Sequence, residues 1–371
     1  MVSTPADPEG LSAQELDRLH AYSFDAAAFA TLRADLAAGR FPPERNQVNE
    51  SISPPRPGDI LPWPTPGTAE ARACQQEGEA ALSAGHVAVA ILNGGMATRF
   101  GGRVKGVVEV VGGHSFLALK LRDVNRVSAK APVFLMNSFA TDHDTRAHLD
   151  GHDHFGLADR IHFVTQGISL RLTPKGDLFR DAQGQVSFYA PGHGDLLAAL
   201  ARSEAFGRFV DGGGKYITIS NVDNLAATLS PMVIGAHIRG RRSLTVEVAP
   251  RQKGDAGGAP VRRGDKLEVL EGFRFPKGFD ADSLPVFNTN TFVLGVEAVR
   301  ADYPLTWFRA DKEVGGAKVV QFERLVGEVT SFAPATYLQV PRQGPAARFL
   351  PVKTPDDVLR VQPLVQQLFA L

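Results

Sequence analysis

The chain has 371 residues, of which 43% are hydrophobic and 22% charged, an ordinary composition for a globular protein with a large core. Forty Lys and Arg residues balance forty Asp and Glu residues, so we expect no affinity for nucleic acid or for an anionic membrane. The single cysteine, Cys74, excludes an internal disulfide and a cysteine-based zinc site, which indicates the cytoplasm. The sequence has no apolar run of about 18 residues and no basic-then-apolar start, so neither a membrane span nor a secretory signal is predicted.

The first part of the chain, residues 1–85, is predicted to be an arm. It combines amphipathic stretches such as Ser12–Ala37 with a proline-rich passage from Phe41 to Pro66. Proline at that density disfavours regular elements and indicates an extended segment lying over a core. We therefore divide the chain into a helical and proline-rich arm, residues 1–85, and one main domain, residues 86–371.

From His86 onward, short apolar or β-branched runs alternate with helix-like segments. The strand-like runs are His86–Leu92, Pro132–Asn137, Ile161–Val164, Tyr216–Ser220 and Ser243–Val248. The helix-like segments are Ser115–Val127, Asp142–Asp150, Gly194–Phe206 and Pro231–Arg239. This alternation predicts an α/β fold with a mostly parallel sheet covered on both faces. Such folds bind ligands beyond the carboxyl ends of their strands.

A glycine-rich loop, Asn93–Lys105, follows the first of these strands directly. Its four glycines allow the main chain to approach a ligand closely, so that consecutive amides can point at phosphate oxygens. The lysine at its end adds a mobile positive charge. The glycine spacing matches neither the dinucleotide fingerprint nor the Walker motif, which disfavours a dinucleotide-dependent oxidoreductase. An ordinary glycine-rich turn is the alternative interpretation.

Six short segments occur in order along the chain. They are Leu92-Asn93-Gly94-Gly95-Met96-Ala97-Thr98, Leu135-Met136-Asn137-Ser138-Phe139, Pro191-Gly192-His193-Gly194-Asp195, Ser220-Asn221-Val222-Asp223-Asn224, Phe287-Asn288-Thr289-Asn290 and Arg348-Phe349-Leu350-Pro351-Val352-Lys353-Thr354. In these segments the chain resembles the UTP:glucose-1-phosphate uridylyltransferase family and its UDP-N-acetylhexosamine pyrophosphorylase relatives. The segments extend from about residue 88 to the C-terminus. The glucose-type branch fits best, at Pro191–Asp195 and Ser220–Asn224.

The resemblance implies a Rossmann-like mixed sheet flanked by helices, of the GT-A-like nucleotide-diphospho-sugar transferase type. It implies that residues 86–371 are a nucleotidyltransferase catalytic domain, which joins UTP to a sugar 1-phosphate, most readily glucose 1-phosphate, and releases pyrophosphate. It also implies a short form that lacks the C-terminal β-helix of the eukaryotic-type glucose enzymes, and we expect a monomer or a weak homo-oligomer. Two alternatives are a UDP-N-acetylhexosamine pyrophosphorylase and a non-catalytic protein that binds nucleotide sugars in a regulatory role.

Six residues are predicted to bind the nucleotide in a protein of this family. The main chain of the glycine loop is predicted to contact the nucleotide. Gly192 is assigned to the base and His193 to the phosphate region. A glutamine amide both donates and accepts, which suits the uracil edge. The predicted nucleotide-binding residues are Asn93, Gly94, Gly95, Gln166, Gly192 and His193. A capping glutamine and a solvent-facing histidine turn are the structural alternatives.

The remaining predicted site residues serve the phosphates and the sugar. Asp223, just after a strand, is the predicted Mg²⁺ ligand, since this hard ion takes few protein oxygens and several phosphate and water oxygens. Lys105 and Lys312 are predicted to offset phosphate charge, the latter lying before a helix-like Val320–Val329. Asn221, Asn288 and Asn290 are assigned to the sugar, the last two because alternate residues of a strand share a face. A helix-capping aspartate, a surface lysine and a polar edge strand are the alternatives.

Overall fold

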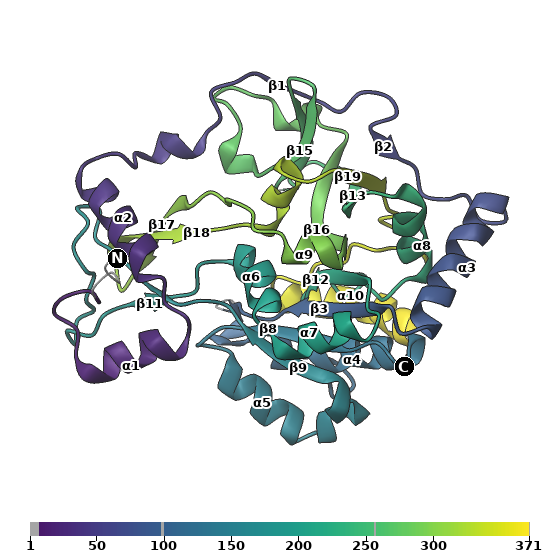
Figure 1. Ribbon diagram of the computed structural model, residues 1–371, viewed down its shortest axis with the longest axis horizontal. Helices are drawn as coiled ribbons and strands as arrows, with labels where there is room; N and C mark the ends of the chain where they lie inside the picture. The colour runs from purple at the N-terminus through teal and green to yellow at the C-terminus, as the bar shows by residue number, and fades with distance from the viewer. Residues whose placement is uncertain (1–6, 98–99, 256, 371) are drawn as a thin grey trace.

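An eight-stranded sheet runs through the centre of the molecule, in the order β2-β19-β13-β16-β12-β3-β8-β9 (Figure 1). The structure is a computed structural model that describes residues 7–97, 100–255 and 257–370. All neighbouring strands are parallel except at β16, which is antiparallel to both β12 and β13. The strands are β2 (Ile60–Leu61), β19 (Ala335–Gln339), β13 (Leu244–Pro250), β16 (Val286–Gly295), β12 (Tyr216–Asn221), β3 (Val87–Leu92), β8 (Val133–Asn137) and β9 (Ile161–Thr165). The predicted mostly parallel sheet is therefore confirmed.

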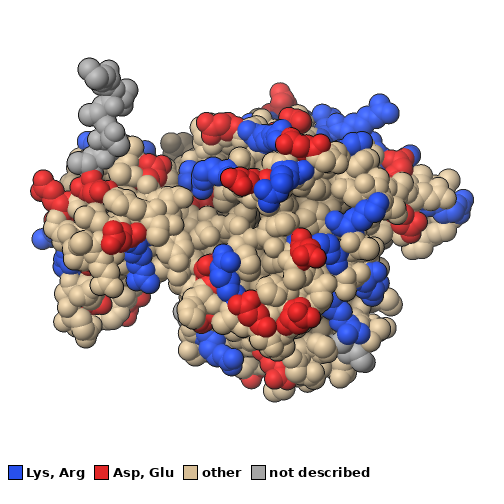
Figure 2. Space-filling view, turned by 60° about the horizontal axis from the view of Figure 1, so that its bottom comes forward, with Lys and Arg blue, Asp and Glu red and all other residues tan. Residues whose placement is uncertain are grey.

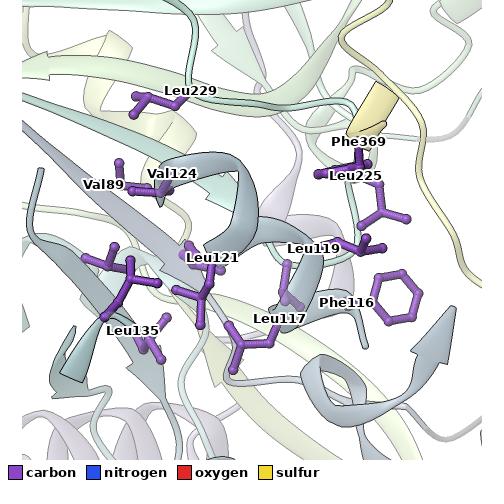
Figure 3. Packing of buried hydrophobic residues seen from close by; sticks show 14 of the residues in the cluster. Val89, Phe116, Leu117, Leu119, Leu121, Val124, Leu135, Leu225, Leu229 and Phe369 are labelled. Carbon is purple, nitrogen blue, oxygen red and sulfur yellow. The ribbon is translucent and has the colours of Figure 1, made fainter. Parts of the chain in front are cut away.

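Helices cover both faces of this sheet, as the completely buried strand β3 requires. The side chains of Val87, Val89 and Ile91 face one hydrophobic cluster, which includes residues of α4 and α10. Ala88, Ala90 and Leu92 face a second cluster, to which α6 and α9 contribute. Figure 3 shows α4 directing Phe116, Leu117, Leu119 and Leu121 into the first cluster. The helices are α3 (Ala69–Ser83), α4 (Phe116–Val127), α5 (Asp142–Asp150), α6 (Leu196–Ala201), α7 (Glu204–Asp211), α8 (Pro231–Gly240), α9 (Val296–Arg300) and α10 (Pro355–Phe369).

Shorter strand pairs surround the main sheet. β17 and β18 form a long hairpin, and β14 and β15 form a second one that also pairs with β1. The bounds are β1 (Ile52–Ser53), β4 (Met96–Ala97), β5 (Arg103–Val104), β6 (Glu109–Val111), β7 (His114–Ser115), β10 (Ser169–Leu170), β11 (Phe188–Tyr189), β14 (Ala259–Arg263), β15 (Lys266–Leu270), β17 (Phe308–Val314) and β18 (Ala317–Glu323).

The N-terminal arm wraps around the main domain and does not pack mainly on itself. Its first helices, α1 (Ala13–Ala21) and α2 (Ala26–Ala37), lie beside β11, β17 and β18 (Figure 1) and share a hydrophobic cluster with β10 and β18. The proline-rich passage supplies β1, which pairs with β14, and β2, which extends the edge of the main sheet. Finally, α3 packs directly against α8.

Two predicted helices differ from those observed. The segment Val320–Val329 is not a helix but the end of β18 followed by a 3-10 helix at Val326–Ser331, because residues 320–323 pair across the hairpin with β17. The predicted Gly194–Phe206 helix is divided between α6 and α7, since Ser203 caps α7 by accepting a hydrogen bond from the Phe206 amide.

The described residues include no helix that is long and apolar enough to cross a membrane. On the face shown in Figure 2, Lys and Arg side chains are interspersed with Asp and Glu side chains. That distribution agrees with the balanced charge of the sequence and offers no large basic area to a polyanion on this face.

Candidate active site

The polar side chains of the predicted site gather at one edge of the main sheet. β3, β8, β9 and β12 are parallel to one another, so their carboxyl ends meet at the same edge. The glycine loop follows β3, Gln166 follows β9, and Asn221 is the last residue of β12. This is where an open α/β sheet binds its ligands.

Two adjoining cavities occupy this edge. The first, here called the glycine compartment, has a volume of about 510 Å³ and is lined by Gly94, Gly95, Lys105 and Gln166 among others. The second, the asparagine compartment, has a volume of about 230 Å³. Its lining includes Gly258, Glu271, Asn288 and Asn290. The two compartments share the four residues His193, Asn221, Asp223 and Lys353, which we call the junction.

Charged groups of both signs lie at and beside the junction. Lys105 Nζ lies 3.4 Å from Asp223 Oδ2, and both side chains are largely buried. The aromatic ring of Phe100 lies 5.0 Å from the same ammonium and helps to hold it. Lys353 brings a second ammonium to both compartments. Anionic groups from two different ligands could therefore meet beside two lysines and one carboxylate.

Gly94 allows the loop to pack onto Gln166. A Cβ atom at position 94 would lie 1.9 Å from Gln166 Nε2, so any side chain there would displace the amide. Gln166 is 4% exposed, and its Oε1 has no hydrogen-bond partner among the described residues. A buried amide with a free acceptor in the wall of a cavity is ready to bind a donor of a ligand.

Asn93 lies beneath the loop and lines neither compartment. Its Nδ2 donates to Asn137 Oδ1 and to Thr145 Oγ1, both at 2.9 Å, and the residue is 1% exposed. The structure therefore gives its side chain a supporting position below Gly94. Positions 98 and 99 of the predicted loop lie outside the described residues.

Gly192 and His193 enter the cleft from the turn before α6. Gly192 has a φ of 94°, and a Cβ atom there would lie only 2.7 Å from the Arg324 carbonyl oxygen, so this position requires glycine. His193 Nδ1 accepts a hydrogen bond from the Val326 amide at 3.1 Å. Burial lowers the pKa of the His193 imidazole to about 4. The ring is therefore neutral near pH 7 with its proton on Nε2, so it offers a donor at the junction.

Asn288 and Asn290 both line the asparagine compartment, as predicted, but regular strand alternation is not the reason. They lie within β16 at a bulge opposite Glu247, where Asn290 has a φ of 55°. The Asn290 amide donates to Asn288 Oδ1, and Asn290 Nδ2 donates to Asn221 Oδ1 at 2.9 Å. The bulge thus brings three amide side chains together.

Lys312 lies outside both compartments. It is on β17, where its Nζ is 3.6 Å from Glu323 Oε1 and its side chain is 48% exposed. Its ion-pair partner Glu323, on the paired strand β18, also lines the glycine compartment, whereas Lys312 itself lines neither compartment. The structure thus brings Lys105, Gln166, Gly192, His193, Asn221, Asp223, Asn288 and Asn290 to one cleft with Gly94 and Gly95, and leaves Lys312 outside it.

Three further charged residues of the cleft were missed by the sequence reasoning. Lys353 lies within the quoted Arg348–Thr354 segment, so its motif was visible although its role was not. Glu271 lines the asparagine compartment, and burial raises the pKa of its carboxyl. Glu323 lines the glycine compartment. No motif marks either carboxylate, because Glu323 ends β18 and Glu271 follows β15, and the placement of both hairpins depends on long-range contacts.

A divalent cation at this junction would have few protein ligands. Among the described residues, no three His, Cys, Asp or Glu side chains come together as a metal-binding group. Asp223 alone offers a partly exposed carboxylate to both compartments. One carboxylate fits an ion such as Mg²⁺ that keeps water and phosphate oxygens as its other ligands, and does not fit a metal held entirely by protein.

Solved structures share this fold. UDP-N-acetylglucosamine pyrophosphorylase from Trypanosoma brucei superposes with a TM-score of 0.77 at 19% identity, covering 95% of this chain and 80% of that one. A UDP-glucose pyrophosphorylase mutant from Leishmania major, solved with UDP-glucose, gives 0.73 at 23% identity, covering 94% and 79%. The class that the fold defines is that of α/β proteins with a mixed sheet flanked by helices.

Comparison of sequences places the chain within that class. Residues 43–369 match the family model of UTP–glucose-1-phosphate uridylyltransferase, and the chain belongs to this family. The proteins of that name from Hordeum vulgare and Solanum tuberosum are 29% and 30% identical over 291 and 296 residues. Each match covers 73% of this chain but 60% of the relative. The chain thus spans less than two thirds of the length of these relatives.

Proposed function

We propose that this chain transfers a uridylyl group from UTP to a sugar 1-phosphate, with glucose 1-phosphate as the preferred acceptor, and releases pyrophosphate. The observation that carries the proposal is the junction, where two compartments of different chemistry share His193, Asn221, Asp223 and Lys353. A transferase for two anionic substrates needs two pockets that meet at the reacting phosphates. The family to which the chain belongs supports the choice of UTP and glucose 1-phosphate.

The glycine compartment suits the nucleotide. The Gly94 and Gly95 main chain can approach the ligand closely, and the free Gln166 Oε1 can accept the imide N–H of uracil. Cytosine has an acceptor at the corresponding ring nitrogen, so its edge would meet the glutamine acceptor unfavourably. We therefore infer that UTP is preferred to CTP at this site.

The asparagine compartment suits a sugar. Asn288, Asn290 and Glu271 surround a cavity of about 230 Å³, and amides and carboxylates can bind several hydroxyl groups at once. Glucose 1-phosphate is our proposed acceptor because the matched curated relatives are named for it. N-acetylglucosamine 1-phosphate is the competing substrate that an assay must include, because the fold is shared with a protein named for that sugar.

The reaction requires neutralisation and alignment of charges more than proton transfer. A phosphate oxygen of the sugar 1-phosphate would attack the α-phosphorus of UTP as the bond to the pyrophosphate oxygen breaks, and pyrophosphate would leave with the electron pair. Lys105 and Lys353 would offset the charge, and the His193 Nε2–H would donate to a phosphate oxygen. Mg²⁺, which Asp223 would hold, would supply further neutralisation between the two phosphates. No nucleophilic side chain and no general base are required.

We further infer that the chain works in the cytoplasm as a monomer or a weak homo-oligomer. Its one cysteine, Cys74, is free and buried, and a free thiol is usual in a reducing compartment. Sedimentation velocity at increasing protein concentration tests the assembly, and a single concentration-independent large species would contradict it.

A pyrophosphate-release assay tests the proposed function. The purified chain is mixed with each of UTP, CTP, ATP and GTP and with glucose, galactose or N-acetylglucosamine 1-phosphate, with and without Mg²⁺. We expect the fastest release with UTP, glucose 1-phosphate and Mg²⁺ together, and little release when any one is omitted. A preference for N-acetylglucosamine 1-phosphate would assign the chain to the hexosamine reaction. Binding of UDP-glucose without any release would make it a non-catalytic nucleotide-sugar-binding protein.

A further inference from the structure

Four charged side chains lie buried beside β12 and the loop that follows it, which carries Asp223. Lys120 and Asp123 come from α4, Glu247 from β13, and Arg348 from the segment before α10. They are between 1% and 5% exposed. Arg348 and Glu247 form a two-bond ion pair, with Nε to Oε2 at 2.6 Å and Nη2 to Oε1 at 2.7 Å. We refer to these four residues as the buried clamp.

The buried clamp holds three consecutive residues of the chain that returns from the junction. Lys120 Nζ donates to the carbonyl of Ala227 at 2.7 Å, and Arg348 Nη2 donates to the carbonyl of Thr228 at 3.1 Å. Asp123 Oδ2 accepts a hydrogen bond from the Leu229 amide at 2.7 Å. Each contact is charge-assisted and directional, so together they fix the path of this segment more closely than apolar packing would.

The same cluster reaches the other end of the loop. Lys120 Nζ also donates to Ser220 Oγ at 3.1 Å, within β12 and one residue before Asn221. The loop that carries Asp223 is therefore held at both of its ends. A single buried ammonium connects these ends.

The segment that carries Lys353 is joined to this loop by main-chain and amide contacts. Asn224 Oδ1 accepts from the Leu350 amide at 2.8 Å, and Asn224 Nδ2 donates to the Arg348 carbonyl at 3.2 Å. The Val352 amide donates to the Asp223 carbonyl at 3.1 Å. Arg348 thus belongs both to the buried clamp and to the segment that ends at Lys353.

A small cavity of about 20 Å³ lies among these groups, and its lining includes Lys120, Ser220, Glu247, Thr291 and Arg348. Its volume is enough for one water molecule. Thr291 Oγ1 is buried and has no partner in the part of the chain that the structure describes. A water bound there would give this hydroxyl a partner and extend the network to β16, one residue from Asn290.

Burying four charges is costly, and packed apolar side chains would often be at least as stabilising. What a charged cluster adds is a defined geometry, because each of its bonds has a preferred length and direction. We propose that Lys120, Asp123, Glu247 and Arg348 are positioning residues that set the separation between Asp223 and Lys353 at the junction. This inference rests on the proposed uridylyl transfer. In it, four residues that touch no substrate hold Asp223 and Lys353 at the distance that the reaction needs.

Variants of the clamp should lose turnover rather than UTP binding. Lys120→Met removes the bonds to Ala227 and Ser220, and Arg348→Met removes those to Thr228 and Glu247. Ser220→Ala is a milder change that removes only the hydroxyl bonded to Lys120. We expect kcat to fall by about 10- to 100-fold in the first two, and the Mg²⁺ concentration for half-maximal activity to rise, as for changes behind a metal ligand. The KM for UTP should change little, because Gly94, Gly95 and Gln166 lie outside the clamp.

A matched control is the Arg262–Asp59 ion pair, whose side chains are 15% and 13% exposed and whose Nη2 to Oδ1 distance is 2.5 Å. Arg262→Met breaks a comparable pair that lines neither compartment. Its thermal stability should fall, while kcat per folded molecule should stay near the native value. If kcat were the same in the native chain, Lys120→Met, Arg348→Met and Ser220→Ala, the positioning role of the clamp would be contradicted. The proposed function would not be affected by that result.

Hydrogen exchange tests the clamp without relying on catalysis. In Lys120→Met and Arg348→Met, amides of residues 221–229 and 348–353 should exchange faster than in the native chain, and Ser220→Ala should show a weaker effect. Exchange in these two segments should be unchanged in the control Arg262→Met. Unchanged exchange there in all three clamp variants would refute the inference even if the native chain had no turnover. Absence of turnover in the native chain alone would contradict only the proposed function.

Discussion

Lys353 and Lys312 show how far single residues could be assigned from the sequence. Lys105 was identified because it ends a glycine loop, and the structure places it 3.4 Å from Asp223. Lys353 was missed, since only the contacts of its segment with Asn224, a distant part of the chain, bring it to the junction. Lys312 was chosen by motif position, but the β17–β18 hairpin pairs it with Glu323. Local pattern identified the loop lysine, whereas tertiary contacts determined the other two positions.

The two lysines provide a matched test. Lys353→Met should lower kcat by about 100-fold, as loss of one charge-stabilising group does at other transferring centres. Lys312→Met removes the same charge from the surface of the hairpin and should stay within about twofold of native. Steady-state kinetics with UTP and glucose 1-phosphate, on variants of equal thermal stability, compares them. If kcat fell as much in Lys312→Met as in Lys353→Met, the assignment of Lys353 rather than Lys312 to the phosphates would be contradicted.

Lys120 gives a prediction for stability against pH. Burial, opposed chiefly by the neighbouring Asp123, lowers the pKa of its ammonium from 10.5 to about 7. Between these values the unfolded chain binds the extra proton and the native chain does not, so the free energy of unfolding rises with pH through this window. Below about pH 7 both states are protonated and the full cost of burying the charge is present.

We expect the native chain to gain stability relative to Lys120→Met as pH is raised from 7 toward 10, by at most about 1.4 kcal/mol per pH unit. Denaturant unfolding of both proteins at several pH values measures the difference, and contributions from other titrating groups largely cancel. A difference that stays constant over this range would show that Lys120 keeps its ordinary pKa in the folded chain.

Among the helices and strands, those with a repeating local pattern were predicted well. Examples are β3 and α4, whose predicted and observed bounds agree within a residue or two. The antiparallel strand β16 and its bulge could not be predicted, since their register depends on pairing with β12 and β13. The bulge is also what brings Asn288 and Asn290 together. The two side chains are therefore close to each other, as predicted, but not through the regular strand alternation on which the prediction was based.

The packing of α3 on α8 is a further feature that no local pattern reveals. A Cβ atom at Gly235 of α8 would lie 1.8 Å from the Cys74 carbonyl oxygen of α3, and one at Gly78 would lie 1.9 Å from the Pro231 carbonyl oxygen. The two helices are therefore in backbone contact at two points. This contact joins the last element of the N-terminal arm to the main sheet.

Gly235→Ala should therefore destabilise the chain by at least about 1–3 kcal/mol, the usual cost of overpacking, because backbone atoms cannot move aside as a flexible side chain can. Gly207→Ala in α7 is the control: its Cβ would have no neighbour within 4 Å, and alanine should stabilise that helix by about 0.5–1 kcal/mol. Thermal or denaturant unfolding of both variants measures the effects. Equal stability of the two variants would contradict the helix contact.

The whole molecule is a main domain built on one large sheet, together with an N-terminal arm that contacts this domain at several separate places. α1 and α2 pack with β10 and β18 in a cluster of their own, whereas β2 and α3 join the main sheet and its helices. The sequence predicted an arm over a core but not these contacts, because proline-rich chain carries no periodic signal of its partners. Residues 1–85 thus differ from the main domain in composition, but the described part of this arm packs against it.

Uridylyl transfer between the two compartments can be followed by ³¹P NMR of the native chain incubated with UTP, glucose 1-phosphate and Mg²⁺. We expect UTP and glucose 1-phosphate to disappear together while UDP-glucose and inorganic pyrophosphate appear in equal amounts, and we expect Asp223→Asn to slow this reaction greatly. Release of inorganic phosphate from UTP, or loss of UTP without consumption of the sugar phosphate, would contradict the proposed transfer.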